Sequence, residues 1–384
     1  RKQFEDTFEW LDKRPCARKR GIGTPLPFDK EWIIESLSDS TIYMTFYTIK
    51  NLINKYEIKP EQLSLKFFDY VYLGEGNITE VAEETQIQIE VLKEMRESFE
   101  YWYPNDHRHT FIAHLSNHLS FFIFTHAGIF PKKDWPKKIS IHGFVIRDGQ
   151  KMSKSKGNVI TLLEANNKYS PEVLRYYMAT STTLDGTFNW RDEDAENVKK
   201  VLMKLYEKLH YMIENKKEGV LSVKCKAFVS KFERNVKEVS THFDKMQYRD
   251  AGVKIVYSLM NDLKRVERVL NDEEKAVLYG YVIERWIKML SPIVPHMAEE
   301  LWSKFKDSFV SLESWPVYDE SKIDKKAEFS DNIVGDVVSD VYEVKKLAKL
   351  DKLNSVKLIV SASWKYGFVK KFKEQESRNV GVLI

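Results

Sequence analysis

The sequence predicts an α/β unit followed by an all-α helical bundle and the start of a further α/β unit. Residues 139–146 are apolar and largely β-branched with partial alternation, which predicts a strand. A turn, a lysine-rich loop and a helix beginning at Pro171 follow, and this order is typical of the edge of a parallel sheet. From about residue 192, long segments of helical periodicity with little glycine or proline predict the bundle.

The remaining elements follow from local composition. Residues 1–28 are basic and contain closely spaced glycine and proline, so we expect an irregular loop there. Ser170-Pro171-Glu172 should cap a helix that runs to about Ala179. The other expected helices are 29–56 (with a hydroxyl-rich interruption at 36–41), 78–100, 110–127, 194–215, 222–240, 248–270, 273–305 and 331–350. Residues 356–362 predict a strand.

These elements divide the chain after residues 191 and 318. Residues 1–191 form the predicted α/β unit and residues 192–318 the bundle. Residues 319–384 form a linker and the start of a last α/β unit, which is too short to complete a core. The first residue is an arginine, so we expect a piece of a longer protein or one half of a split protein.

Composition excludes several classes of protein. The 384 residues are 43% hydrophobic and 13% aromatic, as in a globular protein. Lys+Arg 61 against Asp+Glu 57 leaves a net charge of +4, which does not by itself indicate a nucleic-acid binder. Cys16 and Cys225 make neither a disulfide framework nor a zinc site, and they favour a reducing, cytoplasmic setting. No apolar run approaches the length of a membrane span.

The most informative feature is the run Lys151-Met152-Ser153-Lys154-Ser155, which continues into Lys156-Gly157-Asn158. Its ammonium groups can neutralise the charge that builds on phosphate oxygens during phosphoryl or nucleotidyl transfer. Its hydroxyls can donate hydrogen bonds to the same oxygens. A solvated basic turn is the alternative. A P-loop NTPase is excluded because no G-x-x-x-x-G-K-[ST] motif occurs.

This run resembles the signature loop of class I aminoacyl-tRNA synthetases, and further segments resemble the same family in the same order. By resemblance, the first of these segments lies where the chain re-enters the catalytic fold, and the second lines the amino-acid pocket. The third joins the catalytic domain to the bundle, and the fourth belongs to the anticodon-binding bundle itself. These segments are Trp10-Leu11-Asp12-Lys13 with Arg20-Gly21-Ile22-Gly23-Thr24-Pro25, then Ser38-Asp39-Ser40-Thr41-Ile42-Tyr43-Met44, then 185–192 and 290–302. The archaeal and eukaryotic leucyl type is similar over residues 1 to about 318.

The resemblance implies a fold, a reaction and partners. The fold would be the second half of a Rossmann-type catalytic domain followed by an anticodon-binding bundle. The reaction would be ATP-dependent activation of leucine and its transfer to tRNA(Leu), with Mg²⁺ on the phosphates. Lys151 and Lys154 would be catalytic, and Met152, Ser153 and Ser155 would complete the ATP-binding loop.

The same resemblance implies that Tyr43, His114 and His118 line the amino-acid pocket and that His118 also contacts ATP. His114 and His118 are four residues apart on a predicted helix, so they would share one face. No third ligand lies in register with them, and we predict no metal site. Tyr43 can equally pack in a core, as we expect for Trp286 and Trp302.

Two departures from the family leave alternatives open. The family's second ATP signature, His-Ile-Gly-His, and its editing domain are absent from the sequence, so a separate N-terminal half would supply them. Many relatives carry a glycine and an acidic residue near the ATP ribose where Phe111 and Ala113 stand. The alternatives are a non-catalytic tRNA-binding fragment or decayed paralogue, and an isoleucyl- or valyl-tRNA synthetase fragment.

Overall fold

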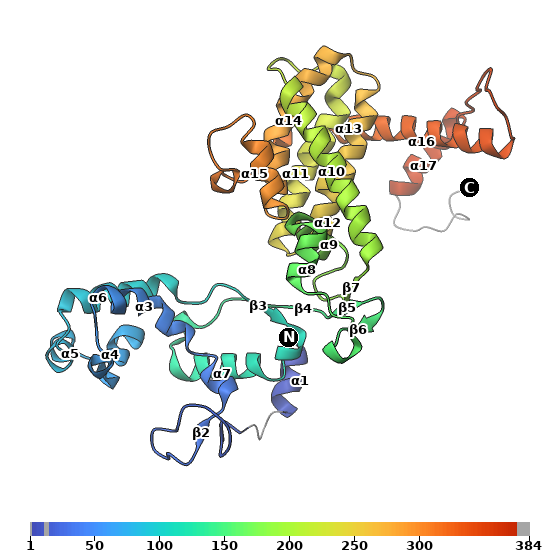
Figure 1. Ribbon diagram of the computed structural model, residues 1–384. Helices are drawn as coiled ribbons and strands as arrows, with labels where there is room; N and C mark the ends of the chain where they lie inside the picture. Colours follow the sequence, from blue (N-terminus) through green and yellow to red (C-terminus); the bar gives the residue numbers. More distant parts are fainter. Residues whose placement is uncertain (1, 11–14, 375–384) are drawn as a thin grey trace.

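The computed structural model describes residues 2–10 and 15–374 and has two main parts joined by short strands (Figure 1). Helices α1 to α7 form the first part, and helices α10 to α15 form a bundle with long, closely packed helices. Strands β3 to β7 lie where the two parts meet, and α16 leaves the side of the bundle (Figure 1). The predicted combination of an α/β unit and a helical bundle is confirmed.

The first part consists of modest helices and very short strands. Its elements are α1 (Lys2–Trp10), β1 (Ala17–Arg18), β2 (Ile33–Ile34), α2 (Ser36–Asp39), α3 (Met44–Lys55), η1 (Pro60–Gln62), α4 (Leu65–Phe68), η2 (Asp69–Leu73), α5 (Ile78–Thr85), α6 (Ile89–Trp102), β3 (Arg108–Phe111), η3 (Ile112–His114), α7 (His118–Ile129) and η4 (Lys132–Asp134). The junction adds β4 (Ile139–His142), β5 (Val145–Arg147), β6 (Gln150–Lys151), η5 (Lys154–Lys156), α8 (Leu162–Tyr169), α9 (Pro171–Thr180) and β7 (Phe188–Trp190).

The bundle and the C-terminal region contain helices and, within the described residues, no strands. Their elements are α10 (Asp192–Asn215), η6 (Val223–Cys225), α11 (Lys226–Asp244), α12 (Tyr248–Val253), η7 (Lys254–Ser258), α13 (Leu259–Glu267), α14 (Asp272–Leu290), α15 (Pro295–Trp302), η8 (Val310–Leu312), η9 (Glu320–Lys322), α16 (Lys325–Leu347) and α17 (Ser363–Glu374). No helix in the described part of the chain is both long enough and apolar enough to cross a bilayer.

The strands form three small sheets. β1 pairs antiparallel with β2, and β3 pairs parallel with β4 from Arg108↔Ile139 to Phe111↔His142. In the third sheet, β5 lies between β6 and β7. β5 is antiparallel to β6 and parallel to β7. The lysine run therefore begins at the end of the second strand of the β5–β6 hairpin, whose first strand is paired in parallel with β7.

The prediction for the first 56 residues is partly wrong. The expected loop at residues 1–28 begins with helix α1. Phe4 and Phe8 are four residues apart on this helix, and their tilted rings form a row of contacts that ends on Phe124 of α7. The expected helix at 29–56 starts only at residue 36, because Ile33 and Ile34 pair with β1. Leu11, Asp12 and Lys13 lie outside the described residues.

The predicted helix at 110–127 is wrong in its first half. Residues 108–111 form strand β3, because they pair with β4 in parallel register. The helix starts only at His118, after Asn117 leaves helical geometry and its side-chain oxygen accepts the His118 amide. His114 and His118 therefore do not share the face of one helix.

The predicted strand at 139–146 is divided at Gly143. A Cβ atom on Gly143 would lie 2.1 Å from the carbonyl oxygen of Gly186, so the two backbones touch there. This contact separates β4 from β5. The predicted helix 78–100 is also divided, at Gln86, which has a φ of 58°. The predicted strand at 356–362 does not form, since these exposed residues have no strand partner within residues 15–374.

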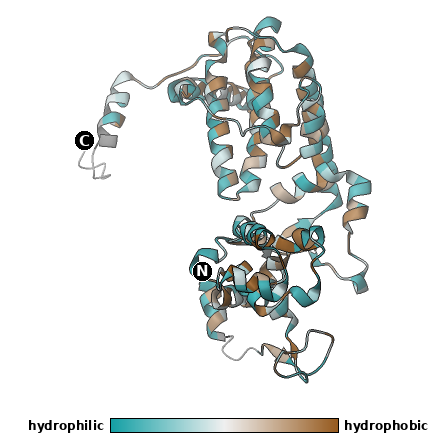
Figure 2. Cartoon of the chain, turned by 90° about the vertical axis from the view of Figure 1, so that its left-hand side faces the viewer, coloured by the Kyte–Doolittle hydropathy of each residue, from teal (hydrophilic) through white to brown (hydrophobic). Residues whose placement is uncertain are grey.

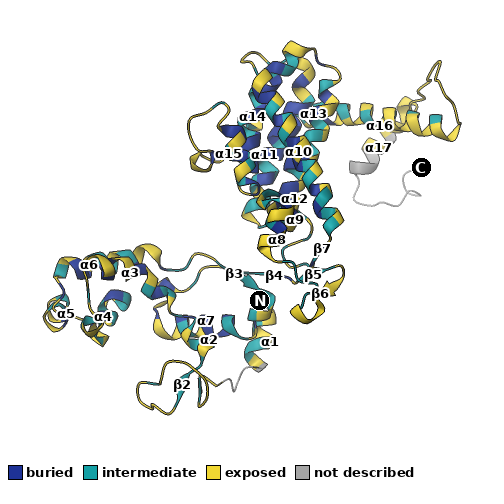
Figure 3. Cartoon of the chain, in the orientation of Figure 1, coloured by how far each residue is buried: buried dark blue, intermediate teal, exposed yellow. Residues whose placement is uncertain are grey.

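The bundle holds the largest hydrophobic core of the described chain. Figure 2 shows hydrophobic residues recurring along the bundle helices, and Figure 3 shows buried residues concentrated in the same region. The predicted core positions Trp286 and Trp302 are both 0% exposed, as expected. The same cluster continues into α8, α9 and β7. The predicted start of α9 is confirmed, since Ser170 caps it and Pro171 is its first residue.

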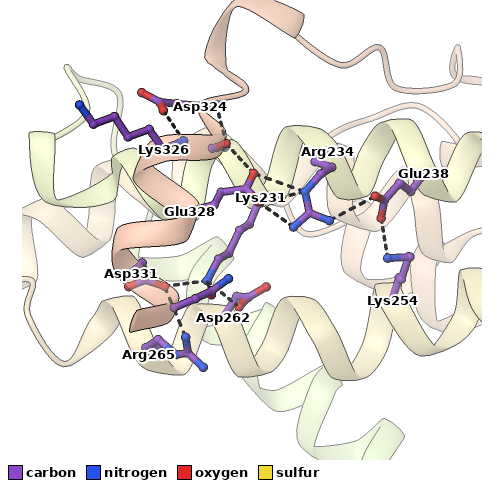
Figure 4. Close-up of polar contacts among 12 residues, drawn as sticks. Lys231, Arg234, Glu238, Lys254, Asp262, Arg265, Asp324, Lys326, Glu328 and Asp331 are labelled. Carbon is purple, nitrogen blue, oxygen red and sulfur yellow. Dashed lines mark hydrogen bonds and ion pairs between the residues drawn. The ribbon is translucent and has the colours of Figure 1, made fainter. Parts of the chain in front are cut away.

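Helix α16 is fixed to the bundle by ionic contacts near its N-terminus (Figure 4). Arg234 of α11 donates to both carboxylate oxygens of Glu328, and Ser230 donates to Glu328 as well. Lys231 is only 5% exposed. Its ammonium group lies 2.6 Å from Asp331 and 3.7 Å from Asp262. Buried charges are tolerated only when paired, so this network fixes the direction in which α16 leaves the bundle.

Replacing Gly143 tests the contact between backbones at the strand junction. Gly143→Ala should lower the free energy of unfolding by about 1–3 kcal/mol, because a carbonyl group cannot yield as a flexible side chain can. Gly128→Ala in α7 is the matched control, since its Cβ would meet nothing within 4 Å. It should be neutral or stabilising by up to about 1 kcal/mol. Urea denaturation of the full chain measures both; equal stability of Gly143→Ala and the parent would refute the contact.

Lys231→Met tests the network that holds α16. It leaves Asp331 and Asp262 without their buried partner, at a cost on the order of 2 kcal/mol, reduced because Asp331 is one-third exposed. Burial raises the pKa of Asp262, and Lys231 opposes that rise. Without Lys231 the folded-state pKa rises further above the unfolded value, so the folded state binds its proton first as pH falls.

The loss of stability in Lys231→Met should consequently be largest near pH 7 and shrink as pH falls toward the unfolded pKa of an aspartate. Lys326→Met, in α16, is the control because the Lys326 side chain makes no ion pair within the described ranges. Denaturation midpoints measured from pH 7 to pH 4.5 provide the test. A penalty that grows with acidity would contradict this account.

Candidate active site

The lysine run forms a short, closed loop at the end of the β5–β6 hairpin. Lys151 ends β6, Ser153 caps η5, and Gly157 closes the turn with a φ of 64°. The Asn158 side chain joins the two ends of the loop, since it accepts from the Ser153 amide at 2.9 Å and donates to the Lys151 carbonyl at 3.2 Å. Sequence alone placed these residues in a loop, and the structure adds this side-chain clamp.

The charged groups of the loop are free to meet a ligand. Lys151, Lys154 and Ser155 are exposed, and Met152 and Ser153 are half-buried. Within residues 2–10 and 15–374, no carboxylate forms an ion pair with Lys151, Lys154 or Lys156. Three uncompensated ammonium groups on a short loop attract an anion with several charges, such as a polyphosphate.

The flanks of the loop are attached to the bundle core. Val145 at the start of the hairpin and Ile160 after the loop both pack against the large cluster that contains the bundle. The turn of the hairpin is tied to β7, because the Gly149 amide donates to the Asn189 side chain and the Asp148 amide donates to the Trp190 carbonyl. The position of the lysine loop is thus set by its attachment to the bundle.

The carboxyl ends of β3 and β4 carry an aromatic group that the sequence analysis missed. The Phe111 ring meets Phe144 edge-on at 4.8 Å and lies 5.6 Å from His142. His109 and His107 both contact the Ser140 hydroxyl, at 2.7 and 2.6 Å. His107, just before β3, and His109, within it, are two residues apart, and this spacing was the available signal. Ligands of open α/β sheets bind at this edge of the strands.

The surroundings of His109 favour its neutral ring. Burial lowers the pKa of His109, and the neighbouring His142 and His107 lower it further. A cavity of about 960 Å³ extends from His109 and His142 toward the start of α12. Its volume is in the range of small-molecule sites.

The structure places His118 beside the segment that contains Tyr43, and His114 nearby. The His118 ring contacts the backbone of Ser40, and its ring centroid lies 6.0 Å from that of His114. Burial lowers the pKa of His118, as does Arg108. Its buried Nδ1 has no hydrogen-bond partner in the part of the chain that is described. Such an atom is costly unless a ligand or water satisfies it.

The other two residues of the predicted pocket have ordinary local contacts. The Nδ1 atom of His114 and the hydroxyl of Thr110 share a hydrogen bond of 2.9 Å. Tyr43 is 45% exposed and meets Tyr47 edge-on. No hydrogen bond, ion pair or ring contact joins these residues to the lysine loop among the described residues. Over the same residues, no group of three or more His, Cys, Asp or Glu could hold a metal ion.

Two family models match consecutive parts of the chain. Residues 78–214 match the description "tRNA synthetases class I (M)", and residues 225–360 match "Anticodon-binding domain of tRNA ligase". The leucine–tRNA ligase of Staphylothermus marinus is 44% identical over 95% of this chain, and leucine–tRNA ligase 2 of Sulfolobus acidocaldarius is 42% identical over 94%. The chain spans only 38% of the length of each of these relatives.

Solved structures share the fold at low sequence identity. Mycobacterium tuberculosis methionyl-tRNA synthetase, bound by methionyl-adenylate, aligns with a TM-score of 0.52 over 78% of this chain and 56% of its own, at 14% identity. The Agrobacterium radiobacter LeuRS in a ternary complex with tRNA and LeuAMS aligns with a TM-score of 0.50 over 58% of this chain and 29% of its own, at 21% identity.

Removing the clamp of the lysine loop should loosen the loop without unfolding the protein. Asn158→Ala deletes both hydrogen bonds that join the loop ends, worth about 1 kcal/mol each. Trypsin should then cleave after Lys151, Lys154 or Lys156 about tenfold faster, while the melting temperature changes little. Asn167→Ala in α8 is the control, since the Asn167 side chain makes no hydrogen bond within the described ranges. Equal cleavage rates in the two variants would show that the clamp does not order the loop.

Proposed function

We propose a function on the premise that this chain belongs to the class I aminoacyl-tRNA synthetases. Together with an N-terminal half, it forms a leucine–tRNA ligase that activates leucine with ATP and transfers it to tRNA(Leu). The reaction takes place in the cytoplasm. The relatives of the leucyl type support this substrate over isoleucine or valine.

The observation that carries the proposal is the free lysine loop. As the leucine carboxylate attacks the α-phosphorus of ATP, negative charge accumulates on the departing pyrophosphate. Lys154 and Lys151 stabilise this charge, and the Ser153 and Ser155 hydroxyls donate hydrogen bonds to the same oxygens. Because their ammonium groups have no carboxylate partners in the described chain, no ion pair must break before they act.

The described residues offer polar contacts for ATP and leucine, and they offer no carboxylate cluster for Mg²⁺. Mg²⁺, when bound, neutralises charge on the phosphate oxygens, and it arrives with the nucleotide because the described residues offer no carboxylate cluster for it. The unpartnered Nδ1 of His118 supplies a polar contact for ATP or leucine. Tyr43 and His114 complete the side of the pocket that binds leucine, since both lie in segments that neighbour His118.

The bundle supplies the surface for tRNA. The match to an anticodon-binding domain supports this role. Helix α10 offers Lys199, Lys200 and Lys204, none of which forms an ion pair within residues 15–374. Lysines without carboxylate partners bind phosphates of an RNA backbone and release counterions.

The N-terminal half would complete the sheet that β3 and β4 begin. Within the described residues these two strands pair only with each other, and every residue in them is exposed or half-buried. Parallel strands are normally buried on both faces, and two strands alone are not stable in water. The partner therefore supplies further strands, the first ATP signature and the editing domain.

A second candidate function is tRNA binding without catalysis. It is favoured by Phe111, whose ring fills the carboxyl end of β3 against Phe144 and His142. A bulky ring there blocks the close backbone approach that a glycine permits. Restoring Phe111→Gly and Ala113→Asp together in an inactive completed enzyme separates the candidates, because recovered activity would identify a decayed ATP site.

We predict that Lys154→Ala lowers kcat for leucine-dependent ATP–pyrophosphate exchange by about 100-fold, on the order of 3 kcal/mol, in an enzyme completed with the N-terminal half. The KM for leucine should change little, because the charge that Lys154 stabilises develops only in the transition state.

Lys156→Ala is the matched control for this prediction. Lys156 lies in the same η5 turn and is equally exposed, but it stands outside the family pentapeptide. Its removal should leave most of the rate. If both variants keep the full rate of an active parent, the loop is a solvated basic turn and the proposed role of Lys154 is wrong.

A further inference from the structure

The segments before and after the lysine loop are both held by one carboxylate, Asp192. Arg147 at the end of β5 donates to Asp192 at 3.4 Å. Lys168 in α8, which follows the loop, donates to the same oxygen at 3.1 Å. The other oxygen accepts from the indole N–H of the buried Trp190 at 2.8 Å. Asp192 is also the first residue of α10, so these contacts converge on the start of the bundle.

The other two carboxylates in the first turn of α10, Glu193 and Asp194, do not make these contacts. Glu193, the next residue of α10, is exposed and forms no ion pair within the described residues. Asp194 accepts from Tyr177 and touches neither side of the loop. Arg147 is additionally 3.6 Å from Asp148 in the hairpin turn, so its guanidinium connects the turn with α10.

We infer that Asp192 is a positioning residue for the lysine loop, which it fixes relative to the helix that runs through the bundle. The consequence for catalysis rests on the proposed function, because it requires that the loop act on a nucleotide. The inference that Asp192 holds the lysine loop in place does not depend on the proposed function. Asp192 touches no reacting atom in this account and acts through Arg147 and Lys168.

The carboxylate is well suited to this role. Its hydrogen bond from Trp190 and its contact with Lys168 lower the pKa of Asp192, so it stays charged at neutral pH. Trp190 is part of the bundle core and cannot move independently of it. One oxygen of Asp192 is therefore held by the core, while the other holds the two flanks of the loop.

The test compares Asp192→Asn with Glu193→Gln by hydrogen exchange of the full chain. Both variants remove one negative charge from the first turn of α10, so effects on the helix dipole are matched. In Asp192→Asn, amides of residues 145–160 should exchange about three- to tenfold faster, as expected for lost ion pairs of partly exposed groups. Amides of α11 and α14 should be unchanged, and Glu193→Gln should match the parent.

Further variants cover the case in which Asp192→Asn destabilises the whole bundle. Arg147→Met and Lys168→Met remove the contacts from the loop side, and each should speed exchange of residues 145–160 while leaving α11 and α14 unchanged. Arg147→Lys should restore part of the protection. If neither loop-side variant alters exchange at residues 145–160, or if Glu193→Gln has the same effect as Asp192→Asn, the inference is overturned.

The catalytic consequence is measured separately in the completed enzyme. Asp192→Asn should lower kcat for pyrophosphate exchange about three- to tenfold with the KM for leucine unchanged, while Glu193→Gln keeps the parent rate. An inactive parent would refute the proposed function, and the hydrogen-exchange result would still decide the role of Asp192. An active parent with a fully active Asp192→Asn would refute the positioning role in catalysis.

Discussion

The attachment of the lysine loop to the bundle core is the interaction on which the rest of the structure depends. Val145 and Ile160, on either side of the loop, pack against a cluster that runs from α8 to η8. Trp190 of β7 lies in the same cluster and donates to Asp192. The lysine loop is consequently attached to the part of the described chain with the largest buried core, and buried apolar area is the main source of folding free energy.

The sheet on the other side of the site has no comparable support. None of the residues in β3 or β4 is buried, and in the aromatic group at their carboxyl ends Phe111 and His142 are half-buried and Phe144 is exposed. The two sides meet where the Gly143 and Gly186 backbones touch. Burial in the described chain is thus concentrated in the bundle, while β3 and β4 lack the cover on both faces that parallel strands normally have.

The sequence predicted what depends on local pattern and missed what depends on distant partners. The bundle, the Ser170 cap and the buried tryptophans follow from periodicity, cap chemistry and hydrophobicity, and they are confirmed. Residues 108–111 were assigned to a helix because nothing local reveals their pairing with β4. Residues 356–362 have strong strand propensity, yet no neighbouring strand lies within the described chain to pair with them.

The candidate site shows the same division. The lysine run was visible in sequence, because residue types and spacing alone predict its role. Its connection to Asp192 was not, since Arg147, Lys168 and Asp192 are far apart in sequence and each is an ordinary surface charge when taken alone. The roles of Tyr43, His114 and His118 stay predictions. The structure adds only that His118 contacts Ser40 and that its Nδ1 has no hydrogen-bond partner among the residues described.

Native-state hydrogen exchange along the whole chain tests the central claim, that the lysine loop belongs to the bundle and the β3–β4 sheet does not. The account predicts that amides of β5, β7 and α9 are protected to the same degree as α10 and α14 and respond together with them to low concentrations of urea. Amides of β3 and β4 should exchange much faster. Protection of β3 and β4 as strong as that of the bundle, or independent opening of β5 and β7, would contradict it.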